Sequence, residues 1–370
     1  MNNNNLTDKP YILLTPGPLT TSSGVKSAML KDWCTWDNEY NSLVQDMRKR
    51  VLDVAEAGDD YTMIPMQGSG TFSVEAVLTS VVGENEKVLI LSNGAYGDRM
   101  KTICDTAKVK NTIYKIEQTE TYNLSHLESI LKEDKEITHV AVVHCETTSG
   151  ILNPIKEIGV IVKNHNKTFI VDAMSSFGGI HFSIPEYQID FLISSSNKCI
   201  QGVPGFGFII ARKSELLKCE GKARSHSLDI FDQWKVMESG NGKWRFTSPT
   251  HVVRAFYQAL LELEAEGGVK AREKRYTENQ DKLVKGMDTL GFKAIITLEK
   301  QSPIITTFYA PNHPDYKFEN FYSKLKEQGF VIYPGKLTKE ESFRIGNIGE
   351  VYPTDIDTLI NSIKNSMFWR

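Results

Sequence analysis

A lysine and an aspartate each follow an apolar run that is typical of a buried strand. Lys198 closes the run that starts at Phe191, and Asp172 ends the run that starts at Thr168. Because ligands bind beyond the carboxyl ends of parallel strands, we expect the amine and the carboxylate to share a site. Such a pair suits pyridoxal phosphate, whose aldehyde forms a Schiff base with a lysine and whose pyridine nitrogen is kept protonated by an acid. Each residue alone could also be a lysine in a turn or an aspartate that caps a loop.

A glycine-rich segment ahead of an apolar helix could bind the phosphate of that cofactor. Residues 66–76 read MQGSGTFSVEA, a turn that leads into a helix whose apolar residues, such as Phe72, suit a buried element. Ser69, Gly70 and Thr71 would offer hydroxyl groups, close backbone approach and the free N–H groups of a helix N-terminus. The segment lacks the lysine of a nucleotide P-loop and the glycine spacing of a dinucleotide site. It therefore fits a small monophosphate better, although an ordinary helix start would look similar.

The composition fits a cytoplasmic enzyme. With 43 Lys and Arg against 46 Asp and Glu the net charge is −3, so no basic field indicates nucleic acid. Five cysteines, odd in number and never spaced as C-x-x-C, argue against a disulfide framework or a zinc site. The asparagine run at the N-terminus precedes no apolar stretch, and no segment reaches the roughly 18 apolar residues of a membrane span. We expect no metal, no membrane and no nucleic-acid partner.

The chain alternates apolar strands with amphipathic helices, which predicts an α/β fold around a mostly parallel sheet covered on both faces. We expect the residues at the carboxyl ends of the strands, including Asn93 and Glu146, to face the ligand. The predicted strands are 87–92, 139–144, 168–172, 191–198 and 207–211, and the predicted helices between them are 97–107, 124–132 and 155–165.

A second, smaller α+β domain is predicted at the C-terminal end. A helix over 251–266 is interrupted by Gly267 and Gly268, and a long charged helix over 269–289 follows. We therefore divide the chain into an N-terminal segment (1–20), a large cofactor-binding domain (21–266) and a small domain (267–370). The small domain has predicted strands at 292–298, 303–309, 330–333 and 342–345, and predicted helices at 317–328 and 354–367.

Six segments together resemble the class V aminotransferases of fold type I, over nearly the whole length. They are LTPGPLT (14–20), DWCTWD (32–37), MQGSGTFSVEA (66–76), NGAYGDRM (93–100), HCETTSG (144–150) and VDAMSSFGG (171–179). The resemblance implies a large domain with a mostly parallel sheet of the seven-stranded type, a smaller α+β domain, and pyridoxal 5′-phosphate as cofactor.

The resemblance also implies a role for each candidate residue of the cofactor site. Lys198 would be the lysine bound to the cofactor, and Asp172 the partner of its pyridine nitrogen. The phosphate would lie in the cup of Ser69, Gly70 and Thr71. The other cofactor contacts are Tyr96 stacked on the ring, Thr147 near the phenolic oxygen, Met174 beside the ring, and Asn197, which stands where glutamine is common.

The resemblance implies roles for two further residues, one in subunit assembly and one in substrate binding. Thr247 would reach the phosphate of the neighbouring subunit, which implies a homodimer with a shared active site. Thr247 could also, or instead, be the N-cap of a helix that starts at Ser248 and Pro249. Arg344 would bind the acidic group of the substrate, because a guanidinium can bind a carboxylate or a phosphonate with two hydrogen bonds. A surface salt bridge with Glu341 is the simpler alternative for Arg344.

The segments at 32–37 and 66–76 resemble the branch of the family that moves the amino group of 2-aminoethylphosphonate to pyruvate. The main alternative is another class V aminotransferase, which takes serine or alanine as donor and glyoxylate or pyruvate as acceptor. A cysteine desulfurase would need a mobile nucleophilic cysteine, but the candidates Cys34 and Cys219 lie in no recognisable active-site loop. A binding or scaffold protein without cofactor is disfavoured, because Lys198, Asp172 and the phosphate cup are all present.

Overall fold

The computed structural model describes residues 11–369, and a seven-stranded sheet forms its centre. The strand order is β2–β10–β9–β8–β5–β3–β4. β10 is antiparallel to both its neighbours, and the strands from β9 to β4 are parallel. The strands are Tyr61–Gln67 (β2), Lys87–Ser92 (β3), Asn111–Lys115 (β4), Ile137–Val143 (β5), Thr168–Asp172 (β8), Phe191–Ser195 (β9) and Phe206–Arg212 (β10).

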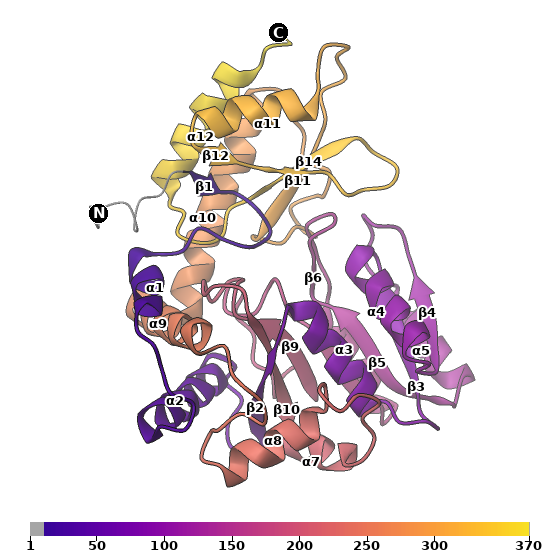
Figure 1. Ribbon diagram of the computed structural model, residues 1–370. Helices are drawn as coiled ribbons and strands as arrows, with labels where there is room; N and C mark the ends of the chain where they lie inside the picture. The colour runs from indigo at the N-terminus through magenta and orange to yellow at the C-terminus, as the bar shows by residue number, and fades with distance from the viewer. Residues whose placement is uncertain (1–10, 370) are drawn as a thin grey trace.

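Helices cover both faces of this sheet (Figure 1). Successive side chains of a strand point to opposite faces, so Leu89 and Leu91 enter one core while Val88 and Ile90 enter the other. α2, α5, α6 and α9 pack on the first face, and α3, α4 and the start of α8 on the second. These helices are Asn38–Val54 (α2), Gly70–Val81 (α3), Ala95–Thr106 (α4), Leu124–Glu133 (α5), Ile155–Asn164 (α6), Ile230–Ser239 (α8) and Thr250–Glu266 (α9).

The C-terminal part has a separate core around a three-stranded antiparallel sheet, β11–β14–β13. The long helix α10 connects it to the large sheet, and α11 and α12 cover it (Figure 1). Its elements are Gly268–Thr289 (α10), Ile305–Tyr309 (β11), Phe318–Glu327 (α11), Phe330–Val331 (β12), Tyr333–Pro334 (β13), Ser342–Gly346 (β14) and Pro353–Ser366 (α12).

The first described residues belong structurally to this C-terminal part. Ile12–Leu13 (β1) pairs in parallel with β12, and Leu14 is buried in the same core as α10 to α12. The chain then returns to the large sheet. The remaining short elements are Ser23–Ser27 (α1), Ala28–Leu30 (η2), Cys145–Glu146 (β6), Ile151–Leu152 (β7), Lys213–Leu216 (α7) and Leu217–Cys219 (η3).

A partly buried ionic cluster centred on Glu266 joins the two parts of the molecule. Its carboxylate accepts hydrogen bonds from Arg272 (2.7 Å and 2.9 Å) and from Arg275 (2.8 Å and 3.2 Å). Arg272 also donates to the carbonyl oxygen of Cys199, and Arg275 to that of Gly349. Burial alone would raise the pKa of Glu266, but hydrogen bonds and charges from the two arginines lower it below its usual value. One carboxylate therefore anchors the loop after Lys198 and the loop after β14.

The predicted α/β fold is confirmed, and most predicted elements agree with the structure within a few residues. The strand predicted at 292–298 is wrong, because only an isolated bridge between Ala294 and Phe308 forms there. Phe72 was expected in a buried position, but its side chain is 52% exposed. The predicted boundary between 266 and 267 lies between α9 and α10. The division of the chain into three segments stays a prediction.

Candidate active site

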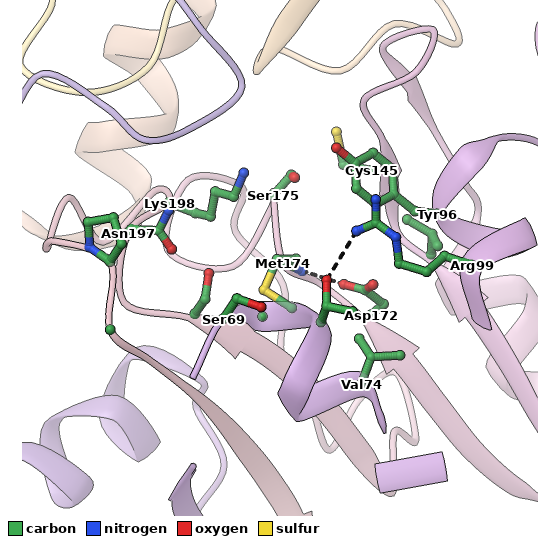
Figure 2. A pocket seen from close by; sticks show the side chains of 16 residues that line it. Ser69, Val74, Tyr96, Arg99, Cys145, Asp172, Met174, Ser175, Asn197 and Lys198 are labelled. Carbon is green, nitrogen blue, oxygen red and sulfur yellow. Dashed lines mark hydrogen bonds between the residues drawn. The ribbon is translucent and has the colours of Figure 1, made fainter. Parts of the chain in front are cut away.

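A cavity of about 230 Å³ opens at the carboxyl ends of β8 and β9, against the start of α3 (Figure 2). Lys198 and Arg99 enter it from different sides. Eight of the residues predicted for the cofactor site line it: Ser69, Gly70, Thr71, Tyr96, Asp172, Met174, Asn197 and Lys198. Segments more than 100 residues apart in sequence therefore contribute to one site, as expected for the ends of parallel strands.

Lys198 lies three residues after β9, and the amine is held under the N-terminal segment of the chain. Its Nζ donates a hydrogen bond to the carbonyl oxygen of Pro16 (2.6 Å). Gly17 has a φ of +123°, and a Cβ atom at this position would lie 2.6 Å from Nζ. A side chain at position 17 would therefore displace the lysine. Burial lowers the pKa of Lys198 to about 8, so a neutral amine is accessible near physiological pH.

Asp172 ends β8 inside the cavity and is 5% exposed. One carboxylate oxygen accepts a hydrogen bond from the backbone N–H of Met174 (2.9 Å), drawn in Figure 2. Burial raises the pKa of Asp172 to about 6, since the hydrogen bond and the distant cations compensate only part of the lost hydration. A cationic group bound beside it would lower this pKa again and stabilise the carboxylate form.

The start of α3 leaves hydrogen-bonding groups available to an anion. Ser69 is the N-cap residue of this twelve-residue helix, but its side chain makes no capping hydrogen bond. The hydroxyl of Thr71 accepts a hydrogen bond from Nη1 of Arg99 (3.1 Å). At Gly70 an added Cβ would lie 2.4 Å from Sδ of Met174, so a side chain here would push the methionine away. The N–H groups and the positive end of the helix dipole face the cavity beside these hydroxyls.

Tyr96 stands in the first turn of α4 and forms one wall of the cavity. Its backbone N–H donates to the buried carboxylate of Glu146 (3.1 Å), which fixes the start of the helix. Cations flank its ring: Cζ of Arg99 lies 4.9 Å and Nζ of Lys336 lies 4.7 Å from the ring centroid. Such contacts are attractive because the ring face carries partial negative charge.

Thr147 and Arg344 contact each other next to the cavity, although neither lines it in the structure. Nη1 of Arg344 donates to the carbonyl oxygen of Thr147 (2.8 Å), and Nε donates to that of Pro334 (3.0 Å). Arg344 is 5% exposed and makes no salt bridge with Glu341, so the surface alternative is wrong. The hydroxyl of Thr147 is buried and has no hydrogen-bond partner among the described residues.

Thr247 lies away from this cavity. It is exposed and lines a separate depression together with Phe72 and Phe246. The alternative reading of Thr247 as a helix cap is wrong, because α9 begins at Thr250 and its N-cap residue is Pro249. Within a single chain, therefore, Thr247 contributes nothing to the cavity.

Several cavity residues were not predicted from the sequence, among them Arg99, Cys145, Ser175 and Ser195. Arg99 follows Tyr96 by three positions on α4, and this spacing places both side chains on one face of the helix. Burial raises the pKa of the Cys145 thiol to about 12, so it is a poor nucleophile. Of the two cysteines considered for a desulfurase, Cys34 is exposed and Cys219 is buried, and neither lines the cavity.

The cavity residues fit pyridoxal phosphate. The hydroxyl of Ser195 is buried, lines the cavity and has no partner within the described part of the chain. Buried polar groups without partners are uncommon in folded proteins, and a ligand would supply one. The cavity is therefore surrounded by three kinds of group: a carboxylate that favours a cation, an amine whose pKa is lowered, and an anion cup. Lys198, Asp172 and the residues 69–71 are the groups that would hold the cofactor.

The model of the family described as aminotransferase class-V matches residues 23–351. The chain belongs to the class V aminotransferases. This confirms the resemblance seen in the six sequence segments and the prediction of an aminotransferase.

Curated relatives of this class V aminotransferase are similar over almost their whole length. A 2-aminoethylphosphonate--pyruvate transaminase of Phocaeicola vulgatus is 59% identical over 96% of this chain and 99% of the relative. A 2-aminoethylphosphonate--pyruvate transaminase of Vibrio vulnificus is 57% identical over 97% of this chain and 98% of the relative. A bifunctional phosphonoacetaldehyde hydrolase/aminoethylphosphonate transaminase of Clostridioides difficile is 57% identical over 96% of this chain but only 56% of the relative.

Solved structures show the same fold at low sequence identity. Pyridoxamine-pyruvate aminotransferase of Mesorhizobium loti has a TM-score of 0.88 at 22% identity and covers 97% of this chain and 92% of its own. Alanine--glyoxylate aminotransferase of Nostoc sp. has a TM-score of 0.88 at 21% identity, and the match covers 99% of both chains.

Between residues 11 and 369, no helix is long and apolar enough to cross a membrane. The same residues contain no cluster of three His, Cys, Asp or Glu side chains suited to a metal ion.

Proposed function

We propose that this class V aminotransferase transfers the amino group of 2-aminoethylphosphonate to pyruvate, which gives phosphonoacetaldehyde and L-alanine. The observation that carries the proposal is identity of 57% to 59%, over nearly the full length, with proteins named for this reaction. The cavity supports it, because it combines an amine of lowered pKa with a buried carboxylate and an anion cup.

In this proposal, Lys198 removes a proton from the substrate carbon that bears the amino group. Pyridoxal phosphate, when bound, supplies an aldehyde that takes up the amino group and a ring that accepts electrons from the substrate carbon. An amine with a pKa of about 8 is neutral often enough near pH 7 to 8 to remove a proton, and its conjugate acid can return one. Pro16 and Gly17 limit where Nζ can lie, which keeps it inside the cavity.

Asp172 and the start of α3 position the cofactor from opposite ends. Buried Asp172 would hold a protonated ring nitrogen, because a cation beside it removes the cost of a buried carboxylate. Ser69, Gly70 and Thr71 would bind the phosphate through hydroxyl and N–H groups at the positive end of the helix dipole. Tyr96 and Met174 would contact the ring, Asn197 would lie near the phosphate, and the unpartnered hydroxyl of Thr147 would reach the phenolic oxygen.

Arg344 would bind the acidic group of each substrate in turn. Two of its nitrogens, Nε and Nη1, are already used by the backbone carbonyls of Pro334 and Thr147, which fixes the plane of the guanidinium. Nη2 makes no hydrogen bond to any residue from 11 to 369 in the structure, so it is free to donate. A fixed guanidinium loses little entropy when it binds an acid.

We also propose a homodimer in which Thr247 contacts the phosphate bound by the partner. The motivation is an exposed apolar patch beside Thr247: Phe72 is 52% exposed at the start of α3, and Phe246 is 47% exposed. Contiguous exposed apolar patches often mark a protein interface. Phe72 belongs to the helix that forms the anion cup, so a partner seated here would lie near that cup. The cytoplasmic location expected from the unpaired cysteines stays a prediction.

An assay with 2-aminoethylphosphonate and pyruvate tests the proposal, with alanine formation as the measurement. We expect alanine and an aldehyde in equal amounts, and a visible absorption band from purified protein supplied with pyridoxal phosphate. Serine with glyoxylate serves as the comparison pair, and we expect turnover with it to be much lower. If serine or alanine with glyoxylate is the better pair, the chain is a different class V aminotransferase. A protein without an absorption band would be a scaffold.

A further inference from the structure

Three cationic side chains from different elements gather at the edge of the cavity. Arg99 extends from α4, Arg344 from β14, and Lys336 from the connection between β13 and β14. Arg99 and Lys336 both approach the ring of Tyr96, at 4.9 Å and 4.7 Å from its centroid. The charges of Arg99 and Arg344 both act on Lys336. The three cations therefore share one small region beside the wall of the cavity.

None of the three cations forms an ion pair with an acidic residue within the described part of the chain. Arg99 donates to a hydroxyl and Arg344 to two backbone carbonyls. The nearby carboxylate of Glu146 is buried and is occupied by Thr148 and by the N–H of Tyr96. Partial burial of the amine and the two arginines lower the pKa of Lys336 below its usual value. The region carries unbalanced positive charge, which favours a ligand with more than one negative charge.

The two substrates differ in the charge of the acidic group. Pyruvate presents a planar carboxylate with one charge, which the guanidinium of Arg344 can match alone. A phosphonate is tetrahedral, has three oxygens and can carry two negative charges, one more than a carboxylate. Its third oxygen points away from the plane of the guanidinium, where a flexible ammonium group suits it better than a second planar fork.

We propose that Lys336 is the residue that selects the phosphonate donor, by binding the oxygen and the second charge that Arg344 leaves unmatched. This inference rests on the proposed function and adds a residue that distinguishes a dianionic donor from a monoanionic one. Lys336 has a four-carbon stem, is exposed to solvent, and lies against Tyr96, so its amine can follow a bound phosphonate.

Lys339, three residues further along the same connection, is a matched control. Its Nζ forms an ion pair with Glu117 (2.7 Å), so its charge is already neutralised outside the cavity. Lys336→Gln and Lys339→Gln each remove one positive charge from one loop. Only the first should alter recognition of a dianion.

The test measures the affinity of the holoenzyme for two unreactive acids, ethylphosphonate and propionate, by isothermal titration calorimetry at a pH above the second pKa of ethylphosphonate, where this acid is a dianion. Neither acid has an amino group, so binding is read without turnover. For Lys336→Gln we expect the dissociation constant of ethylphosphonate to rise about tenfold or more, because a charge-assisted hydrogen bond is lost. We expect the propionate constant to change less than about twofold. Lys336→Arg should recover part of the ethylphosphonate affinity, and Lys339→Gln should bind both acids as the unmodified enzyme does.

A turnover comparison keeps this inference separate from the proposed function. The ratio of kcat/KM for 2-aminoethylphosphonate to that for 3-aminopropionate, its carboxylate counterpart, should fall about tenfold in Lys336→Gln. Equal weakening of ethylphosphonate and propionate, or no weakening of either, would overturn the role of Lys336. If the unmodified enzyme prefers ethylphosphonate but does not turn over 2-aminoethylphosphonate, the proposed reaction fails while the anion preference stands.

Discussion

The floor and the edge of the cavity hold their charged groups in different ways. On the floor, Asp172 is the last residue of β8 and Lys198 follows the adjacent strand β9. Both side chains form hydrogen bonds with backbone atoms, and burial shifts the pKa of each. At the edge, the cations belong to α4 and to the β13–β14 region, and two of them, Arg99 and Lys336, are exposed. Chemistry common to the family needs the fixed floor, whereas the choice of substrate can change with the edge.

Replacement of the lysine on the floor should have the largest effect. For Lys198→Ala we expect loss of both the visible absorption of bound cofactor and alanine formation, because no other amine lines the cavity in the described structure. Absorption spectra and the coupled alanine assay measure this. A cofactor adduct that borohydride can still fix to the mutant protein would show that a different lysine does this work.

Asp172→Asn should reduce turnover without abolishing cofactor binding. The variant should still bind pyridoxal phosphate through the anion cup, but we expect turnover to fall by roughly a hundredfold or more, because an amide cannot keep a ring nitrogen protonated. Cofactor content and kcat are measured on the same sample. A loss of less than about tenfold would mean that another acid holds the ring nitrogen.

Arg344→Lys tests the edge of the cavity. The charge remains but the planar fork is lost, so we expect KM to rise about tenfold or more for both 2-aminoethylphosphonate and pyruvate. The cofactor spectrum should stay unchanged, since Arg344 does not line the cavity. An effect on one substrate only would contradict a shared site for the two acids.

The lowered pKa of Lys198 predicts a pH dependence of cofactor uptake. Only the neutral amine attacks an aldehyde, and burial lowers its pKa from 10.5 to about 8. The neutral fraction therefore rises about tenfold between pH 7 and pH 9, and the rate of pyridoxal phosphate uptake by the cofactor-free protein should rise with it and then level off. Stopped-flow absorbance measures the rate. A rate that keeps rising to pH 10 would show that the amine is not shifted.

Thr247 should have the smallest effect on a single chain. We expect Thr247→Ala to weaken cofactor affinity severalfold, because one hydroxyl contact to the phosphate is lost. At a limiting cofactor concentration, Thr247→Ala chains mixed with Lys198→Ala chains should be more active than Thr247→Ala chains alone, because one site of the heterodimer has both residues intact. Mixtures that show no such gain although the chains exchange would place Thr247 outside the partner's site.

The floor could be predicted from the sequence because local patterns define it. Asp172 and Lys198 follow continuous apolar strands, and residues 69–71 precede a helix. Parallel strands ending at one edge then bring these groups together, as predicted. The failures have physical reasons: Phe72 follows the apolar pattern of α3 yet faces outward, and residues 292–298 are apolar enough for a strand but find only one bridging residue.

The edge could not be predicted to the same extent because tertiary contacts define it. Lys336 lies in a polar connection with no periodic pattern, and its position against Tyr96 depends on how the C-terminal part meets α4. Pro16 and Gly17 contact Lys198 although about half of the chain separates them in sequence. No local sequence pattern other than the glycine itself predicts this contact. Arg344 was predicted only through the family resemblance.

The ionic cluster at Glu266 has a thermodynamic consequence for these two regions. Its carboxylate holds the loop that follows Lys198 through Arg272, and the loop that follows β14 through Arg275. Local opening of either loop would leave a buried charge with fewer partners, so the two loops should open together rather than one at a time. The conformations of the two loops are therefore coupled: a ligand that favours the closed form of the loop after Lys198 also favours the closed form of the loop after β14.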